Sequence, residues 1–286
     1  MTIRTRSKRI NRMFLKSFIR FLISFAFIAS PICWATEEIP KIIAHRGASA
    51  SAPENTMAAF KLAWEQGADG IEADFFLTAD GEVVCIHDEN TKKTGSGSLD
   101  VKKSTLAQLR TLEYGAWKHP IFKGEFIPTL AQVIDGLPEG KWFFLEIKDS
   151  PAIVKPIAKI LAEKRSNKDR LVLISFNKEV VRACRQTMPE YRACLLSSLD
   201  KFTKEGWKEK YLRDLDSCGS QGLAYKENQA VTKKWLAKAR GEDGILAAWT
   251  VNNREPALRA ASRGVDFLIT DRPGGLRAEL KPASRE

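Results

Sequence analysis

The residues that could carry chemistry in this chain stand at or near the ends of short apolar runs. Histidine is scarce, and two of the chain's three histidines directly follow such runs. Imidazole titrates near neutral pH, so a pair of histidines can act as general acid and general base. The candidates that share this placement are His45, Arg46, Glu72, Asp74, His87, Glu146, Lys148 and Trp249.

Three of these candidates are carboxylates with the spacing of metal ligands. Glu72 and Asp74 are two residues apart in the run GIEADFFLT, and a strand sends every second side chain to the same face. Carboxylates held side by side repel each other unless a cation separates them. With Glu146 they make a ligand set of oxygens alone, which favours Ca²⁺ or Mg²⁺ over Zn²⁺.

The whole set is coherent for cleavage of a phosphodiester. A divalent cation on the three carboxylates would polarise a phosphoryl oxygen. Arg46 and Lys148 would hold the remaining anionic oxygens, the first through its planar guanidinium group and the second as a point charge. His45 and His87 would then move protons. The sequence leaves open which of the two histidines is the base.

Simpler interpretations of the same residues stay open at this stage. Glu72 and Asp74 could be solvated positions of an edge strand, and Glu146 with Lys148 could be an ordinary ion pair on one face. Trp249 could pack in the core or form an apolar wall beside a substrate. The functional interpretation is favoured because two histidines and three carboxylates are expected at one place in the fold.

The elements that must position these residues alternate along the chain between strand-like and helix-like runs. The predicted strands are 42–45, 70–76, 83–87, 142–147, 171–175, 193–196, 223–225, 245–250 and 267–270. The predicted helices are 56–66, 151–164, 178–187, 232–239 and 256–263. This alternation predicts an α/β fold, a TIM (β/α)8 barrel, with an open doubly wound sheet as the alternative. In a barrel the carboxyl ends of the strands meet at one mouth, where the candidates would gather.

One segment interrupts the alternation. Residues 89–128, approximately, follow the strand predicted at 83–87 and contain only one short helix signal, after Ser104. A connection of this length inside a compact domain is uncommon unless it is functional. We therefore expect a small insertion after the second strand unit of the barrel.

Residues 1–35 have the organisation of a secretory signal peptide. They contain seven basic and no acidic residues, followed by the apolar run FLISFAFIAS, which is short for a transmembrane span. We expect cleavage after Ala35, leaving 36–286 as one exported domain, periplasmic or secreted, with an uncleaved membrane anchor as the alternative. Without this segment the formal charge falls from +11 to +4, with 39 basic and 35 acidic residues. We therefore expect no nucleic-acid partner and no stable membrane insertion of the mature chain.

Four cysteines remain in the expected mature chain. Cys85 lies inside a strand-like run and is expected to be a buried thiol. An exported protein could pair two of the other three, Cys184, Cys194 and Cys218. There is no CxxC or Cys/His cluster with zinc spacing, so we do not expect a metal site built from thiolates.

Five segments together resemble the glycerophosphodiester phosphodiesterase family. They are HRGASASAPENTMAAF, GADGIEADFFLTADGEVVCIHDEN, LEIK, WTVN and GVDFLITDRP, and they occur in the family's order. They span residues 42–273, nearly all of the expected mature chain. The His-Arg-Gly triplet alone would be a weak signal, whereas the combination is specific.

The resemblance implies a TIM barrel that hydrolyses deacylated phospholipids such as glycerophosphocholine or glycerophosphoethanolamine. The products would be glycerol 3-phosphate and an alcohol. The resemblance implies that His45 and His87 are the acid–base pair. It implies that the metal ligands are Glu72, Asp74 and Glu146. Arg46 and Lys148 would contact the phosphate, and Trp249 would line the glycerol side. The alternatives are a lysophospholipase D or a sphingomyelinase D-like enzyme on the same fold, or a binding protein without catalysis.

Overall fold

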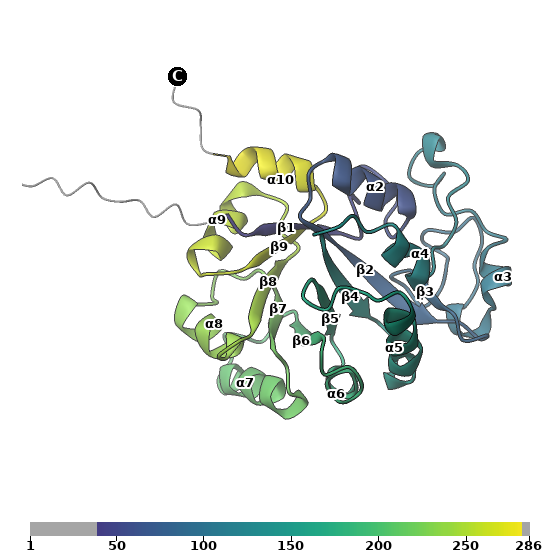
Figure 1. The fold of residues 1–286 in the computed structure, drawn as a ribbon. Helices are drawn as coiled ribbons and strands as arrows, with labels where there is room; N and C mark the ends of the chain where they lie inside the picture. Colours follow the sequence, from purple (N-terminus) through teal and green to yellow (C-terminus); the bar gives the residue numbers. More distant parts are fainter. Residues whose placement is uncertain (1–38, 282–286) are drawn as a thin grey trace, which may run out of the picture. The chain divides into compact units, whose positions relative to one another are not determined.

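Runs of branched and aromatic residues form the strands of a closed barrel (Figure 1). The computed structural model describes residues 39–281. Eight parallel strands make the ring: β1 (Lys41–His45), β2 (Gly70–Leu77), β4 (Trp142–Ile147), β5 (Leu171–Ser175), β6 (Arg192–Ser197), β7 (Gly222–Lys226), β8 (Ile245–Trp249) and β9 (Phe267–Thr270). Because β1 pairs with both β2 and β9, the ring is closed. The predicted TIM barrel is confirmed.

Helices connect the strands and cover the outside of the ring (Figure 1). They are α2 (Met57–Glu65), α4 (Leu130–Asp135), α5 (Val154–Glu163), α6 (Lys178–Thr187), α7 (Trp207–Cys218), α8 (Lys233–Arg240), α9 (Arg254–Ser262) and α10 (Pro273–Leu280). The Thr56 hydroxyl accepts a hydrogen bond from the N–H of Ala59, so α2 begins directly after the loop that follows β1. A short 3-10 helix, η3 (Pro151–Ile153), precedes α5.

The barrel has an apolar layer on each side of the strands. Alternate residues such as Ala44 and Leu145 pack outward against the helices. Their neighbours, such as Ile43 and Phe144, fill the inside of the ring. The same alternation puts Ile71 and Ala73 of β2 in the outer layer. The acidic residues between and beside them therefore point into the barrel.

The strand predicted at 83–87 is shorter than expected and lies outside the ring. It is β3 (Val83–Cys85), which pairs antiparallel with the end of β2. Only five residues, 78–82, join β2 to β3. A parallel crossover needs a dozen residues or so, and therefore this connection can only form a hairpin.

The insertion begins after β3 and builds a small core of its own. It contains η1 (Val101–Lys103), α3 (Leu106–Leu109) and η2 (Pro120–Phe122). Its buried apolar side chains pack with residues of the hairpin, in a cluster of Phe76, Val84, Ile86, Val101, Leu109, Tyr114 and Ile127. Figure 1 shows the insertion on one side of the barrel, beside β3 and α2.

Three other predictions concern the N-terminus and the cysteines. The predicted signal peptide lies outside the described residues. Within 39–281, no helix is both long enough and apolar enough to cross a membrane. The four cysteines in this range are all buried and free, so Cys85 is the buried thiol that was predicted, and the pairing left open among the other three is not formed.

Candidate active site

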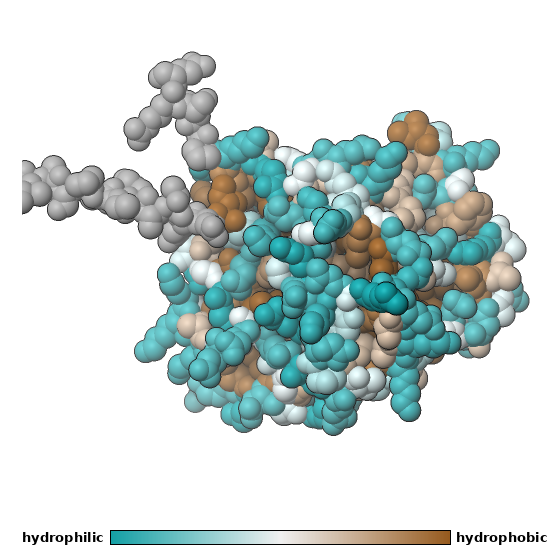
Figure 2. Space-filling model, in the orientation of Figure 1, coloured by the Kyte–Doolittle hydropathy of each residue, from teal (hydrophilic) through white to brown (hydrophobic). Residues whose placement is uncertain are grey.

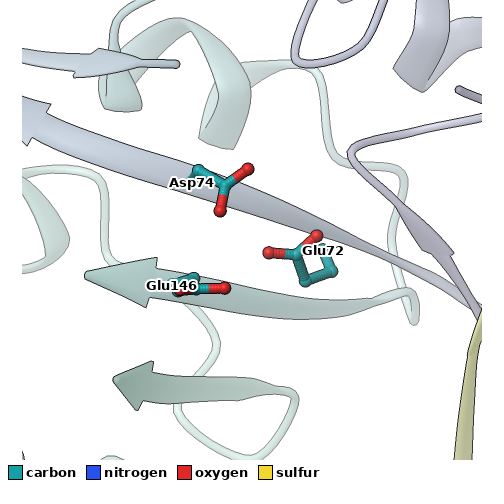
Figure 3. A group of neighbouring side chains, drawn as sticks. All are labelled: Glu72, Asp74 and Glu146. Atoms are coloured by element: carbon teal, nitrogen blue, oxygen red, sulfur yellow. The ribbon is translucent and has the colours of Figure 1, made fainter. Parts of the chain in front are cut away.

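Three buried carboxylates meet inside the carboxyl-end mouth of the barrel. Glu72 and Asp74 come from β2, and Glu146 comes from β4, where it is the direct neighbour of Asp74 across the two strands. Figure 3 shows the three side chains converging on one space. One oxygen of each lies within 4.8 Å of the others. Their exposed fractions of 1%, 0% and 7% exclude solvated positions on an edge strand.

The carboxylates are left with acceptor atoms that the chain does not satisfy. Among residues 39–281, no donor makes a hydrogen bond to Glu72 Oε1 or Asp74 Oδ1, and Glu146 Oε1 has only the ammonium group of Lys148 beside it. Burial raises the pKa of Glu72 well above its usual value, and the charges of Asp74 and Glu146 raise it further. Burial also raises the pKa of Glu146 to about 7. Buried oxygens that repel one another and lack donors fit a divalent cation of the Ca²⁺ or Mg²⁺ type.

Arg46 contacts two of the three carboxylates from the loop after β1. Its backbone N–H donates to Glu72 Oε2 at 3.0 Å, and its Nε lies 3.2 Å from Asp74 Oδ2. Its Nη1 donates to Glu54 Oε1 at 2.9 Å. Arg46 has a φ of 57°, in the left-handed region that few side chains adopt. The loop therefore turns sharply enough to bring both the backbone and the guanidinium group of this residue to the carboxylates.

Lys148 is the second cation of the site and touches both carboxylates of the β2–β4 pair. Its Nζ lies 2.9 Å from Glu146 Oε1 and 3.6 Å from Asp74 Oδ1. Burial raises the pKa of Asp74, but Arg46 and Lys148 outweigh it and hold this pKa below its usual value. Asp74 is thus the carboxylate that the chain itself keeps ionised.

His45 is held by a carboxylate that the sequence analysis did not single out. Its Nδ1 lies 2.6 Å from Asp271 Oδ1, and its Nε2 lies 3.9 Å from Glu72 Oε2. Asp271 also accepts hydrogen bonds from Ser49 and Asn252. Burial raises the pKa of Asp271, but these three partners outweigh it and lower the pKa to about 2. An ionised Asp271 therefore fixes the ring of His45, with Nε2 directed to the site.

His87 reaches the same space by a different route. His87 directly follows β3, which is antiparallel to β2. The β2–β3 hairpin therefore brings His87 back beside β2, whereas the other candidates reach the mouth on or after parallel strands. Its Nδ1 lies 2.6 Å from Asp88 Oδ1, and its Nε2 lies 3.1 Å from Lys148 Nζ. Burial lowers the pKa of His87, as do Arg46 and Lys148, against the opposing charge of Asp74. With an ammonium group at Nε2, the ring is neutral and carries its lone pair on that atom.

A cavity of about 270 Å³ joins these groups. Seven of the eight predicted residues line it, and Asp74 lies behind them, fully buried. The cavity lining also has an apolar part, which consists of Ile174, Phe176, Leu196, Trp249 and Ile269. Phe176 and Trp249 meet edge to face, with 5.6 Å between ring centroids, and the Lys148 ammonium lies 5.8 Å from the centre of the Phe176 ring. The structure thus brings together all the predicted residues, with charged and apolar side chains around one cavity.

Asp271, Asn55 and Phe176 are among the site residues that the sequence analysis did not single out. Asp271 directly follows the predicted strand 267–270 and could have been found by the same strand-end rule as the others. Asn55 donates to Asp74 Oδ2 at 2.8 Å, and it comes from a loop whose path no periodicity reveals. Phe176 follows the strand Leu171–Ser175, where an aromatic residue gives no signal of chemistry.

The comparisons with known proteins agree with this geometry. Residues 45–275 match the model of the glycerophosphoryl diester phosphodiesterase family. The chain belongs to the glycerophosphodiester phosphodiesterase family. This is a family of phosphoric diester hydrolases, so the chain is an enzyme by membership.

This chain matches individual relatives over almost their whole length. A glycerophosphodiester phosphodiesterase of Caldanaerobacter subterraneus is 34% identical over 238 residues, which are 81% of this chain and 94% of that protein. A phosphodiesterase of Oleispira antarctica, solved with the product sn-glycerol-3-phosphate, superposes with a TM-score of 0.74 at 27% identity, covering 85% of this chain and 97% of that one. A glycerophosphodiester phosphodiesterase of Agrobacterium tumefaciens has a TM-score of 0.70 at 25% identity and covers 84% and 99% of the two chains.

Proposed function

We propose that this protein hydrolyses glycerophosphodiesters, such as glycerophosphocholine and glycerophosphoethanolamine, to glycerol 3-phosphate and an alcohol. The observation that carries the proposal is the cavity of about 270 Å³ in which two histidines, two cations and the carboxylate cluster face one another. Family membership and the product held by the Oleispira antarctica phosphodiesterase support this substrate class.

The carboxylates would hold the metal, and the cations would hold the phosphate. Ca²⁺ or Mg²⁺ on Glu72, Asp74 and Glu146 would supply neutralisation of charge at a phosphoryl oxygen. Arg46 and Lys148 line the same cavity and bind the other anionic oxygens. Trp249 adds an apolar surface to the same cavity, which suits the carbon backbone of glycerol.

The two histidines have environments that suit opposite roles. The low pKa of His87 keeps its ring neutral at pH 7, the form that a general base needs. His45 is oriented by its contact with the ionised Asp271, and its Nε2 points to the site. We therefore assign His87 as the base that deprotonates the attacking 2-hydroxyl of glycerol, and His45, the other histidine of the cavity, as the acid that protonates the leaving alcohol. Water then opens the cyclic phosphate to give glycerol 3-phosphate.

A substrate panel with each divalent cation tests this function. The purified chain 36–286 should release glycerol 3-phosphate from glycerophosphocholine with Ca²⁺ or Mg²⁺, and EDTA should abolish the release. No turnover of any glycerophosphodiester with any cation would refute the proposal. The same absence of turnover would favour the interpretation as a binding protein, whereas a His45→Ala variant as active as the wild type would remove His45 from the acid–base pair.

A substrate with an acyl chain is the second candidate. The observation that favours it is Phe176, an apolar side chain of the cavity wall that is 48% exposed at the rim. Faster turnover of lysophosphatidylcholine or sphingomyelin than of glycerophosphocholine in the same panel would select a lysophospholipase D or sphingomyelinase D activity.

We also propose that the protein is exported, as the predicted signal peptide at residues 1–35 indicates. N-terminal sequencing of the protein from the extracytoplasmic fraction should begin at Thr36. A protein that keeps its first residues and stays with the membrane would instead support the anchor.

A further inference from the structure

The insertion exposes apolar side chains next to the barrel mouth. Residues 39–281 contain six large hydrophobic side chains that are exposed, and three of them lie in one stretch of the insertion, residues 117–126: Trp117, Ile121 and Phe126, with exposed fractions of 42%, 75% and 55%. Figure 1 shows a turn of the insertion projecting beside α2, and brown atoms lie at the end of that turn in Figure 2. We call residues 115–124 the insertion tip. Scattered apolar side chains on a surface are common, but a projecting group is a mark of a binding surface.

Hydrogen bonds hold the insertion tip in one shape. The carboxylate of Glu113 accepts from the backbone N–H groups of Gly115, Ala116 and Gly124, which closes the two ends of the tip on each other. A Cβ at Gly115 would lie 1.9 Å from the carbonyl oxygen of Phe122, so only glycine allows this approach. These contacts fix the conformation of the tip, so its apolar side chains stay exposed to water.

The tip is also cationic. Lys118 lies between Trp117 and Ile121, and the exposed Lys123 follows Ile121. Neither lysine has a carboxylate within salt-bridge distance among residues 39–281. The Lys118 ammonium lies 5.8 Å from the centre of the Trp117 ring. A tryptophan, an aliphatic residue and the exposed ammonium of Lys123 on one projection match the boundary of an anionic bilayer, which offers apolar and negatively charged partners together.

The tip is tied to the active site. Lys118 Nζ donates to the carbonyl oxygen of Ser49 at 2.8 Å. The hydroxyl of Ser49 in turn donates to Asp271, the partner of His45. A surface that contacts the tip therefore lies beside the rim of the catalytic cavity.

We propose that the insertion tip docks the enzyme on the surface of an anionic phospholipid bilayer. Trp117 and Ile121 enter the headgroup region, and Lys123 contacts lipid phosphates. The docking is peripheral and needs no helix that crosses the bilayer. It goes beyond the proposed hydrolysis and does not depend on it, since binding is measured without turnover.

Sedimentation with vesicles tests the proposal. The chain 36–286, which contains every described element, is mixed with vesicles of phosphatidylcholine or of phosphatidylcholine with phosphatidylglycerol. We expect binding to the phosphatidylglycerol vesicles, weaker at high salt, and reduced about fivefold or more by Ile121→Asp or Lys123→Glu. The matched controls are Leu258→Asp and Lys234→Glu, on the exposed faces of α9 and α8, and they should bind like the wild type.

Three results would overturn the proposal: no binding of the wild type to either vesicle, equal binding to both vesicles, or an equal loss in the tip variants and their controls. Circular dichroism and thermal unfolding of each variant separate loss of binding from loss of fold. A second variant, Trp117→Ser, keeps the test decisive if Ile121→Asp aggregates.

Discussion

The raised pKa of Glu72 indicates that the carboxylate cluster needs a cation to be fully ionised. Its carboxylate is buried beside two others, and its raised pKa means that the ionised form is unfavourable without a cation. We expect Glu72→Gln to unfold at the same temperature as the cation-free wild type or a higher one. The wild type should gain stability on addition of Ca²⁺ and the variant should not, while kcat/KM falls by roughly 100-fold or more. Calorimetry with and without Ca²⁺ measures both effects; equal stabilisation of the two proteins would remove Glu72 from the ligand set.

His87 sets the expected response to pH. Because burial lowers its pKa, the neutral base persists below pH 6.5, and activity should fall only as the pH drops through this lowered pKa. Asp88 opposes the shift through its bond to Nδ1. Asp88→Asn should therefore move the acidic limb of the kcat/KM profile to a still lower pH. A limb that moves upward or stays in place would show that another group controls it.

Asp271 is a positioning residue, since it touches His45 and not the cavity groups that would hold phosphate. Asp271→Asn keeps the shape but removes the carboxylate that orients the ring of His45. We expect kcat to fall about 10- to 1,000-fold with KM nearly unchanged, because the ring of His45 loses its fixed orientation. Steady-state kinetics measure this split between kcat and KM, and an unfolding temperature equal to that of the wild type distinguishes it from a structural defect.

At the scale of elements, the loop between β1 and α2 depends on one glycine. Gly47 has a φ of 81°, and a Cβ there would lie 2.6 Å from the backbone of Ala59 in α2. Gly47→Ala should lower the free energy of unfolding by about 2 kcal/mol or more, because it combines backbone strain with overlap, and it should displace Arg46. Gly81→Ala is the control, since Gly81 has a φ of 86° but open space around it. Urea unfolding compares the two, and equal losses would mean that the contact with Ala59 is irrelevant.

The hairpin is the element that completes the site. Five residues between β2 and β3 force the chain to reverse, and this reversal delivers His87 opposite Lys148. The same reversal starts the insertion, whose tip reaches Ser49 on the first loop. One short turn therefore accounts for both the second histidine of the cavity and the surface proposed to meet lipid.

At the scale of the whole molecule, the barrel interior supports the carboxylates from below. Phe144 stands one inward position before Glu146 on β4 and meets the ring of Phe267 on β9, with 5.0 Å between centroids. Phe144→Ala should cost about 3–5 kcal/mol of unfolding free energy, because it leaves a cavity in a closed ring. Phe126→Ala, at an exposed position, should cost less than about 0.5 kcal/mol. Chemical denaturation of both variants measures the difference; similar costs would mean that the ring interior tolerates the loss.

The sequence by itself predicted the barrel and the eight candidate residues that the structure brings together at its mouth. It could do so because the signals are local: apolar alternation selects the inward face, and the end of each strand marks the mouth. Glu72 with Asp74, and Glu146 with Lys148, were visible as pairs two residues apart.

Only the tertiary structure decided which side chains contact one another and so orient one another or shift each other's pKa values. The contact of His45 with Asp271 joins residues 226 positions apart, and that of His87 with Lys148 joins residues 61 positions apart. The direction of β3 and the bond of Lys118 to Ser49 are likewise set by packing. Such contacts depend on how the ring closes and where the insertion folds back, and no period in the sequence encodes those distances.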